Sequence, residues 1–275
     1  MTTRHAVPEE VSCLFLPGMT LNGTLFPEVP GPSLAVDFRE LVVSPNGEFP
    51  EGQLDRMDFY VARLDEALND WSEWRAAKRI IVAHSFGGML ALSWLLKNRG
   101  SEVAKIDGLV LCSTTCGPMF DIARLSVARI LKRPVTMGLK NFMRFWNLPV
   151  VTRTVKRILT RGSLAVRYVD LRDLKRKSDA AVDRAGWRQT DWRAMRSYRL
   201  AMDGFDVRNK IADLDVATIV LHGGRDSVFP PSVGEELVRF LPNATLRPIP
   251  DAGHALPLTH PDSVLQAVGD LVRRV

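Results

Sequence analysis

Residues 79–96 have the sequence RIIVAHSFGGMLALSWLL, in which a β-branched run stops at a short turn and a helical pattern then begins with small residues. This order predicts a strand, a sharp turn at Ser85 and a helix. Such a turn strains the serine and lifts its hydroxyl clear of the sheet, and the small neighbours Ala83 and Gly87 relieve the crowding. The N-terminus of the following helix favours developing negative charge. Ser85 is therefore a candidate nucleophile, although a Ser-x-Gly-Gly turn can also serve only to pack a helix closely on a strand.

The two ends of the chain alternate short β-branched runs with helical patterns, which is typical of a parallel sheet with crossover helices. Strands are expected at 11–16, 40–44, 79–84, 106–113, 216–222 and 244–249. Helices are expected at 55–74, 86–98, 231–240 and 261–273. Pro231 and Pro261 stand where prolines of a first helical turn belong. The predicted fold class is α/β, with a mostly parallel, doubly wound sheet.

The middle of the chain differs in kind from its ends. Residues 117–210 have long helical stretches, no convincing strand, and 22 Lys and Arg against 8 Asp and no Glu, a net charge of +14 that leaves −8 elsewhere. We expect 1–116 and 211–275 to form one core domain and 117–210 to be an inserted helical cap. The basic residues of the cap either form a solvated face or steer an anionic partner.

Length and composition are those of a folded globular protein, with 275 residues of which 46% are hydrophobic and 25% charged. The start has no signal-peptide pattern and no apolar run approaches the roughly 18 residues of a membrane span, so we expect a cytoplasmic protein without a membrane span. The three cysteines lack metal-ligand spacing, so we expect reduced buried thiols and no metal. The formal net charge of +6 comes without a recognition motif, so no nucleic acid is expected as a partner.

A serine nucleophile needs a histidine within hydrogen-bond reach and a carboxylate that fixes the tautomer of that histidine. His254 lies in the loop PDAGHALPLTHP, after the last expected strand, and is the candidate base. Asp226 follows the strand at 216–222, at the sheet edge where α/β folds place catalytic groups, although turns also favour Asp. The remaining histidines have structural explanations in a frayed terminus, at strand ends or as a helix cap: His5, His84, His222 and His260.

Acyl transfer also needs backbone N–H donors for the oxyanion, each commonly worth about 3 kcal/mol. Phe86 follows the candidate nucleophile and supplies the first expected donor. The loop after the first strand supplies the second, because Gly18 allows a turn there and Met19 carries the amide. A plain turn is the alternative for this loop.

Three motifs of the chain together resemble those of the α/β-hydrolase superfamily. They are the elbow AHSFGG at 83–88, the acid loop HGGRDSVFP at 222–230 and the histidine loop AGHALPLTHP at 252–261. The resemblance covers about 11–116 and 205–275 but not the cap. It implies an α/β-hydrolase fold whose nucleophile, acid and base follow in the order Ser85, Asp226 and His254.

The chain departs from the family pattern outside these three side chains. Ala83 replaces the first glycine of the usual Gly-x-Ser-x-Gly elbow, and Pro17-Gly18 stands where His-Gly is usual. Ser44-Pro45-Asn46-Gly47 replaces the usual Asp-x-x-Gly turn. These departures bear on the subfamily and leave the candidate nucleophile, base and acid intact.

Within the superfamily, Gly18–Asn22 and His254–Pro257 are similar to carboxylesterases that cleave the methyl ester of pimeloyl-acyl carrier protein. In that group a cap contacts the acidic carrier through arginines, which fits the basic segment 117–210. The resemblance implies a cofactor-free carboxylesterase with a small-molecule ester substrate and an acidic acyl carrier protein as partner. Aromatic residues of the cap are candidates for an acyl pocket: Phe142, Phe145, Trp146 and Trp187.

Other activities use the same three side chains. A thioesterase or acyltransferase acting on carrier- or coenzyme-A-linked acyl groups is the nearest alternative, since one triad serves both leaving groups. Cofactor-free haloperoxidase or carbon–carbon bond hydrolase activity is also compatible. A non-catalytic ligand-binding protein on a hydrolase scaffold is the alternative from another class, and the complete set of Ser, His and Asp argues against it.

Overall fold

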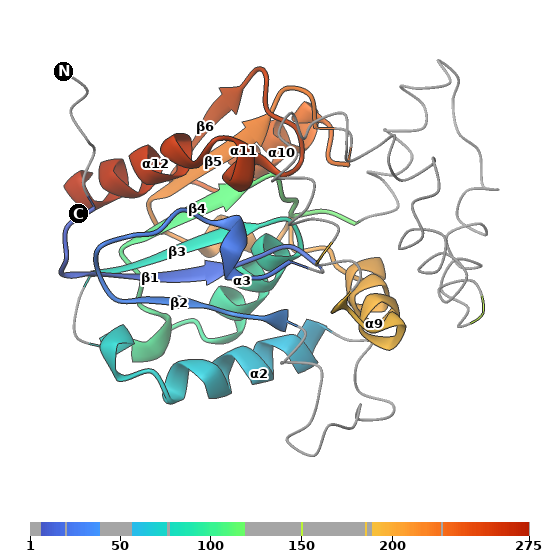
Figure 1. Cartoon of the computed structure of the whole chain (residues 1–275), viewed down its shortest axis with the longest axis horizontal. Helices are drawn as coiled ribbons and strands as arrows, with labels where there is room; N and C mark the ends of the chain where they lie inside the picture. The colour runs from blue at the N-terminus through green and yellow to red at the C-terminus, as the bar shows by residue number, and fades with distance from the viewer. Residues whose placement is uncertain are drawn as a thin grey trace.

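The structure, a computed structural model, describes residues 7–19, 21–38, 57–75, 78–118, 150, 185, 189–226 and 228–274 (Figure 1). Several predicted features lie outside these residues. They are the strand at 40–44 and the candidate pocket residues Phe142, Phe145, Trp146 and Trp187.

The described strands form one sheet in the order β2-β1-β3-β4-β5-β6, and every neighbouring pair is parallel. The strands are β1 (Val11–Leu16), β2 (Ser33–Ala35), β3 (Lys78–His84), β4 (Gly108–Cys112), β5 (Thr218–Gly223) and β6 (Ala244–Ile249). The predicted α/β class with a parallel sheet is confirmed. The short strand β2, first in the order of the described strands, was missed, because three residues with exposed or partly exposed side chains carry no clear hydrophobic alternation.

The helices follow the predicted crossovers. They are α2 (Met57–Asn69), α3 (Phe86–Lys97), α9 (Trp192–Asp203), α10 (Pro231–Phe240), α11 (Leu256–Thr259) and α12 (Pro261–Arg274). Short 3-10 turns are η1 (Gly23–Leu25), η2 (Ser72–Arg75), η3 (Glu102–Ala104) and η4 (Ile211–Asp213). Pro231 and Pro261 each begin a helix, as predicted. The helix predicted at 55–74 is shorter, because α2 ends at Asn69 and η2 follows.

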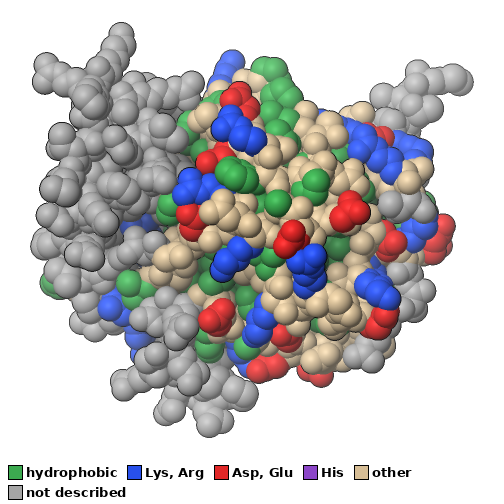
Figure 2. All heavy atoms as spheres, turned by 180° about the vertical axis from the view of Figure 1, so that it is seen from behind, with side chains coloured by type: hydrophobic (Ala, Val, Ile, Leu, Met, Phe, Trp, Pro, Cys, Tyr) green, Lys and Arg blue, Asp and Glu red, His purple; other side chains and the backbone are tan. Residues whose placement is uncertain are grey.

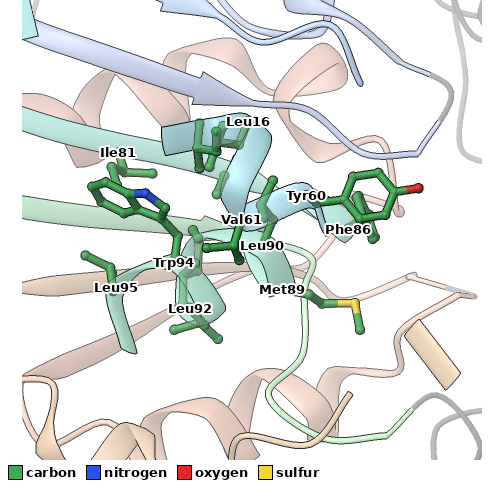
Figure 3. Close-up of a cluster of buried hydrophobic side chains, with 14 of the residues drawn as sticks. Leu16, Tyr60, Val61, Ile81, Phe86, Met89, Leu90, Leu92, Trp94 and Leu95 are labelled. Carbon is green, nitrogen blue, oxygen red and sulfur yellow. The ribbon is translucent and has the colours of Figure 1, made fainter. Parts of the chain in front are cut away.

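Two apolar layers hold the fold together, one on each face of the sheet. Alternate residues of each strand point to opposite faces, so Leu14 and Ile81 enter one layer while Cys13 and Ile80 enter the other. The first layer packs under α2, α3 and α10, and the second under α12 (Figure 1). Figure 3 shows part of the first layer, with buried side chains of α2 and α3 meeting those of the strands. All three cysteines are buried and unpaired, as the sequence predicted.

Helix α9 lies within the range predicted as cap and packs on the first layer. The ring of Tyr198 lies 5.3 Å from that of Phe86 and 5.6 Å from that of Tyr60. The hydroxyls of Tyr60 and Ser197 share a hydrogen bond. These contacts attach α9 to α2 and to the start of α3.

The surface of the described region carries both signs of charge. On the face drawn in Figure 2, Lys and Arg side chains are interspersed with Asp and Glu side chains. Exposed ion pairs such as Arg99–Asp213, at 2.9 Å, contribute at most about 1 kcal/mol each. In the part of the chain that the structure covers, no helix combines the length and apolar character that a membrane crossing requires.

Candidate active site

Ser85 lies between the end of β3 and the start of α3, on the sharp turn that the sequence predicts. Its backbone has φ 52° and ψ −119°, a conformation that costs a non-glycine residue about 1–3 kcal/mol. Neighbouring groups hold it in place. The Ser85 N–H donates to the carbonyl of Cys112 at 3.1 Å, and Thr114 Oγ1 donates to the Ser85 carbonyl at 2.6 Å. The end of β4 therefore fixes the backbone of the candidate nucleophile.

The base and acid candidates converge on this turn. His254, in the loop between β6 and α11, has its Nε2 3.0 Å from Ser85 Oγ. Its Nδ1 lies 3.0 Å and 3.2 Å from the two carboxylate oxygens of Asp226, which follows β5. The Asp226 side chain is fully buried, whereas 16% of the His254 side chain is exposed. The structure thus brings the three predicted side chains together in a series that runs from a fully buried carboxylate to the partly buried His254 and Ser85.

The surroundings of Asp226 keep its carboxyl ionised. Burial opposes the charge, but the charge and hydrogen bond of His254, the neighbouring His222 and the Phe229 N–H outweigh it, so the pKa of Asp226 lies below its ordinary value. Asp226 Oδ1 accepts the N–H groups of Val228 and Phe229 at 2.9 Å and 2.8 Å. An ionised carboxylate on Nδ1 makes that nitrogen the donor and leaves Nε2 of His254 free to accept the Ser85 proton.

The two expected oxyanion donors lie on segments that flank Ser85. Phe86 is the first residue of α3, so its N–H has no partner inside the helix. The loop that carries Met19 passes beside the serine, because a Cβ added at Gly18 would lie 3.2 Å from Ser85 Cβ. Met19 itself is partly buried against the first apolar layer. The first turn of α3 and the loop around Gly18 therefore both lie beside Ser85, and the role of the Phe86 and Met19 amides stays a prediction.

Two side chains next to the base were not predicted as parts of the site. The ring of Phe229 packs edge-on against the His254 ring at 5.2 Å, and the His84 ring lies 4.9 Å from it. Sequence reasoning assigned His84 a structural role and gave Phe229 none. The one available signal was position, since His84 directly precedes Ser85 and Phe229 follows Asp226 by three residues in the acid loop.

Within the described residues, no three His, Cys, Asp or Glu side chains gather closely enough to hold a metal ion.

The family model described as alpha/beta hydrolase fold matches residues 73–261 of the chain. No curated protein matches the sequence.

Solved structures resemble the chain over nearly its whole length. A thermophilic esterase from Thermogutta terrifontis, solved with malate bound, has a TM-score of 0.68 at 19% identity, covering 96% of this chain and 90% of that chain. MenH from S. aureus has a TM-score of 0.66 at 14% identity, with 98% and 95% covered. The esterase RhEst1 from Rhodococcus sp. ECU1013 has a TM-score of 0.62 at 14% identity, with 98% and 92% covered. At these identities the likeness is one of fold.

Proposed function

The chain belongs to the alpha/beta hydrolase fold family, and from this premise we propose that it is a serine hydrolase that cleaves a carboxylic ester through an acyl-enzyme. One observation carries the proposal. A buried carboxylate, an imidazole and a serine hydroxyl lie in series, with 3.0 Å from His254 Nδ1 to Asp226 Oδ2 and 3.0 Å from His254 Nε2 to Ser85 Oγ. This is the arrangement that activates a serine for attack on an acyl group.

In the proposed reaction, Ser85 Oγ attacks the ester carbonyl while His254 Nε2 accepts the hydroxyl proton. The tetrahedral oxyanion accepts hydrogen bonds from the backbone N–H groups of Phe86 and Met19. His254 then returns the proton to the leaving alkoxide, and an alcohol departs. Water, deprotonated by His254, attacks the acyl-enzyme, and His254 returns that proton to Ser85 Oγ as the bond between Ser85 and the acyl group breaks and the acid departs. Asp226 stays ionised throughout and stabilises the imidazolium form of His254.

The substrate class follows from the cap. We propose that residues 117–210 are an inserted helical cap that sets substrate choice, with Phe142, Phe145, Trp146 and Trp187 lining an acyl pocket. Its net charge of +14 supports a substrate linked to an acidic acyl carrier protein, such as a carrier-linked methyl ester. If the cap steers the carrier, the affinity should fall steeply with salt, because charges are screened beyond about 10 Å at 0.1 M.

A fluorophosphonate probe tests the nucleophile. We expect the wild-type protein to be labelled, and Ser85→Ala to lose labelling completely. Ser12→Ala, at a buried serine near the amino end of β1, is the matched control and should label normally. Persistent labelling of Ser85→Ala would end the proposal. Turnover on matched oxygen esters, thioesters and carrier-linked methyl esters then separates esterase from thioesterase, and His254→Ala should lose roughly a thousandfold or more in kcat.

A further inference from the structure

The side chain of His84 lies between the backbone of His254 and the loop around Gly18, and His84 directly precedes Ser85. It is the last residue of β3 and is only 1% exposed. Its Nε2 lies 2.8 Å from the backbone carbonyl oxygen of His254. The other side of its ring faces the β1 loop, because a Cβ added at Gly18 would lie 2.8 Å from His84 Nδ1.

The hydrogen bond fixes which ring nitrogen carries the proton. A carbonyl oxygen only accepts, so Nε2 of His84 is the donor and the proton sits there. Burial lowers the pKa of His84 to about 3, so the ring is neutral and Nδ1 bears a lone pair. Among the residues that the structure describes, this buried Nδ1 has no hydrogen-bond partner.

Core packing alone does not explain such a residue. An apolar side chain would fill the same space without burying an unpaired nitrogen, which is unfavourable. What the imidazole adds is one directed N–H bond, made to the backbone of the residue whose side chain holds Ser85 Oγ at 3.0 Å. The hydrogen bond therefore holds the backbone of His254, the candidate base.

We propose that His84 is a positioning residue: its Nε2–H anchors the backbone of His254, and its ring braces Gly18 on the loop that carries Met19. One neutral side chain thereby sets the distance between base and nucleophile and seats the loop of the second oxyanion donor. The proposal rests on the proposed function, because it concerns the geometry of the same reaction. A displacement of about 1 Å in such a site can cost 10²-fold in rate.

Two amide substitutions test whether a hydrogen-bond donor at the position of Nε2 is needed or whether any polar side chain at position 84 is enough. In His84→Gln the side-chain amide nitrogen reaches about as far as Nε2, whereas in His84→Asn it reaches only about as far as Nδ1. We expect His84→Gln to keep kcat within about fivefold of wild type. We expect His84→Asn to lose about 10- to 100-fold in kcat with KM changed by less than about threefold. The rate of fluorophosphonate labelling should fall in parallel with kcat, because activation of Ser85 is what suffers.

A third variant covers the case in which His84→Asn does not fold. His84→Leu fills the space without a donor, so we expect its Tm to be retained while kcat falls as in His84→Asn. Ser12→Ala serves as the control, since it removes another buried bond to a backbone carbonyl, that of Glu73 at 2.9 Å, far from the site. It should lower Tm slightly and leave kcat unchanged.

The outcomes separate cleanly. Equal kcat in the Gln and Asn variants, wild-type kcat in His84→Leu, or losses of kcat that only follow losses of Tm would each overturn the positioning role. Those results leave the proposed function standing if Ser85→Ala still abolishes labelling. Labelling that survives in Ser85→Ala would instead remove the proposed function and this inference together.

Discussion

Gly87 packs directly against the backbone of Leu16: a Cβ at position 87 would lie 2.1 Å from the Leu16 carbonyl oxygen. This contact joins the first turn of α3 to the end of β1, and the loop that carries Met19 begins at that end. The distance between α3 and β1 therefore also sets the distance between the two expected oxyanion donors, the N–H groups of Phe86 and Met19. A side chain at 87 would push them apart.

We predict that Gly87→Ala is destabilising and inactivating. The added methyl meets backbone, which cannot turn aside, so the free energy of unfolding should fall by about 1–3 kcal/mol, with a larger relative loss in kcat/KM. Urea denaturation and ester turnover check this. Gly204→Ala is the matched control, because a Cβ there would meet nothing within 4 Å. Equal effects of the two substitutions would show that the contact at Gly87 is unimportant.

We predict that Asp226→Asn keeps the fold and loses the reaction. The amide can hold His254 in the wrong tautomer, with Nε2 protonated and unable to accept from Ser85, so kcat at neutral pH should fall by roughly 10⁴-fold. Steady-state kinetics with unchanged circular dichroism would support this. A loss of less than tenfold would mean that the contact of 3.0 Å between His254 Nδ1 and Asp226 Oδ2 does not orient the base.

Acid should destabilise the protein well above the pH at which carboxylates titrate. The folded-state pKa of His84 is about 3, below the ordinary value of 6.5, so between these values the unfolded state binds the extra proton. The stability from this group is fully present above about pH 6.5 and is lost as pH falls toward 3, by about 1.4 kcal/mol per pH unit. Burial also lowers the pKa of His222, which adds in the same direction.

Denaturation at pH 7, 6 and 5 measures this slope. In His84→Gln the position can no longer be protonated, so the decline should be shallower, by an amount that approaches about 1.4 kcal/mol per pH unit below about pH 6. Parallel curves for wild type and variant would contradict the assignment of a neutral buried imidazole at position 84.

We predict that Asp65 matters for stability and not for turnover. Its Oδ1 accepts from Trp94 Nε1 at 2.6 Å and from Asn98 Nδ2 at 2.9 Å, which ties α2 to α3. Asp65→Ala leaves the buried Trp94 N–H without that acceptor and should cost about 1–3 kcal/mol. Asp213→Ala, which removes the exposed ion pair of Asp213 with Arg99, should lower the free energy of unfolding by at most about 1 kcal/mol. A kcat change in Asp65→Ala at a temperature where it is folded would contradict the separation of the two roles.

The sequence predicted the parts of this molecule that have a strong local signal. The strand and helix around Ser85 alternate clearly, and the positions of Asp226 and His254 after strands predict their meeting at one sheet edge. The predicted α/β-hydrolase fold is confirmed. The short strand β2 could not be predicted, because its place depends on backbone pairing with β1 and not on its own side chains.

The finer relations of the site depend on contacts between distant segments. The sequence predicts a structural role for His84, and the side chain is buried, but its bond to the carbonyl of His254 joins residues that nothing in the local pattern relates. The aromatic cluster of Tyr60 and Phe86 with Tyr198 could not be predicted either, since Tyr198 belongs to the range predicted as an inserted helical cap and the other two belong to the predicted core domain. Hydrophobic periodicity predicts a helix or strand, whereas the side chains that it contacts are seen only in the folded structure.

The seating of α9 on Tyr60 and Phe86 has a practical consequence for exchanging specificity between relatives. A chimera that grafts a foreign insertion into this scaffold would have to place its downstream junction ahead of Asp191, which caps α9. A junction at the end of the basic segment, after residue 210, would remove Tyr198. The side chains of Tyr60 and Phe86 that Tyr198 covers would then be exposed to water.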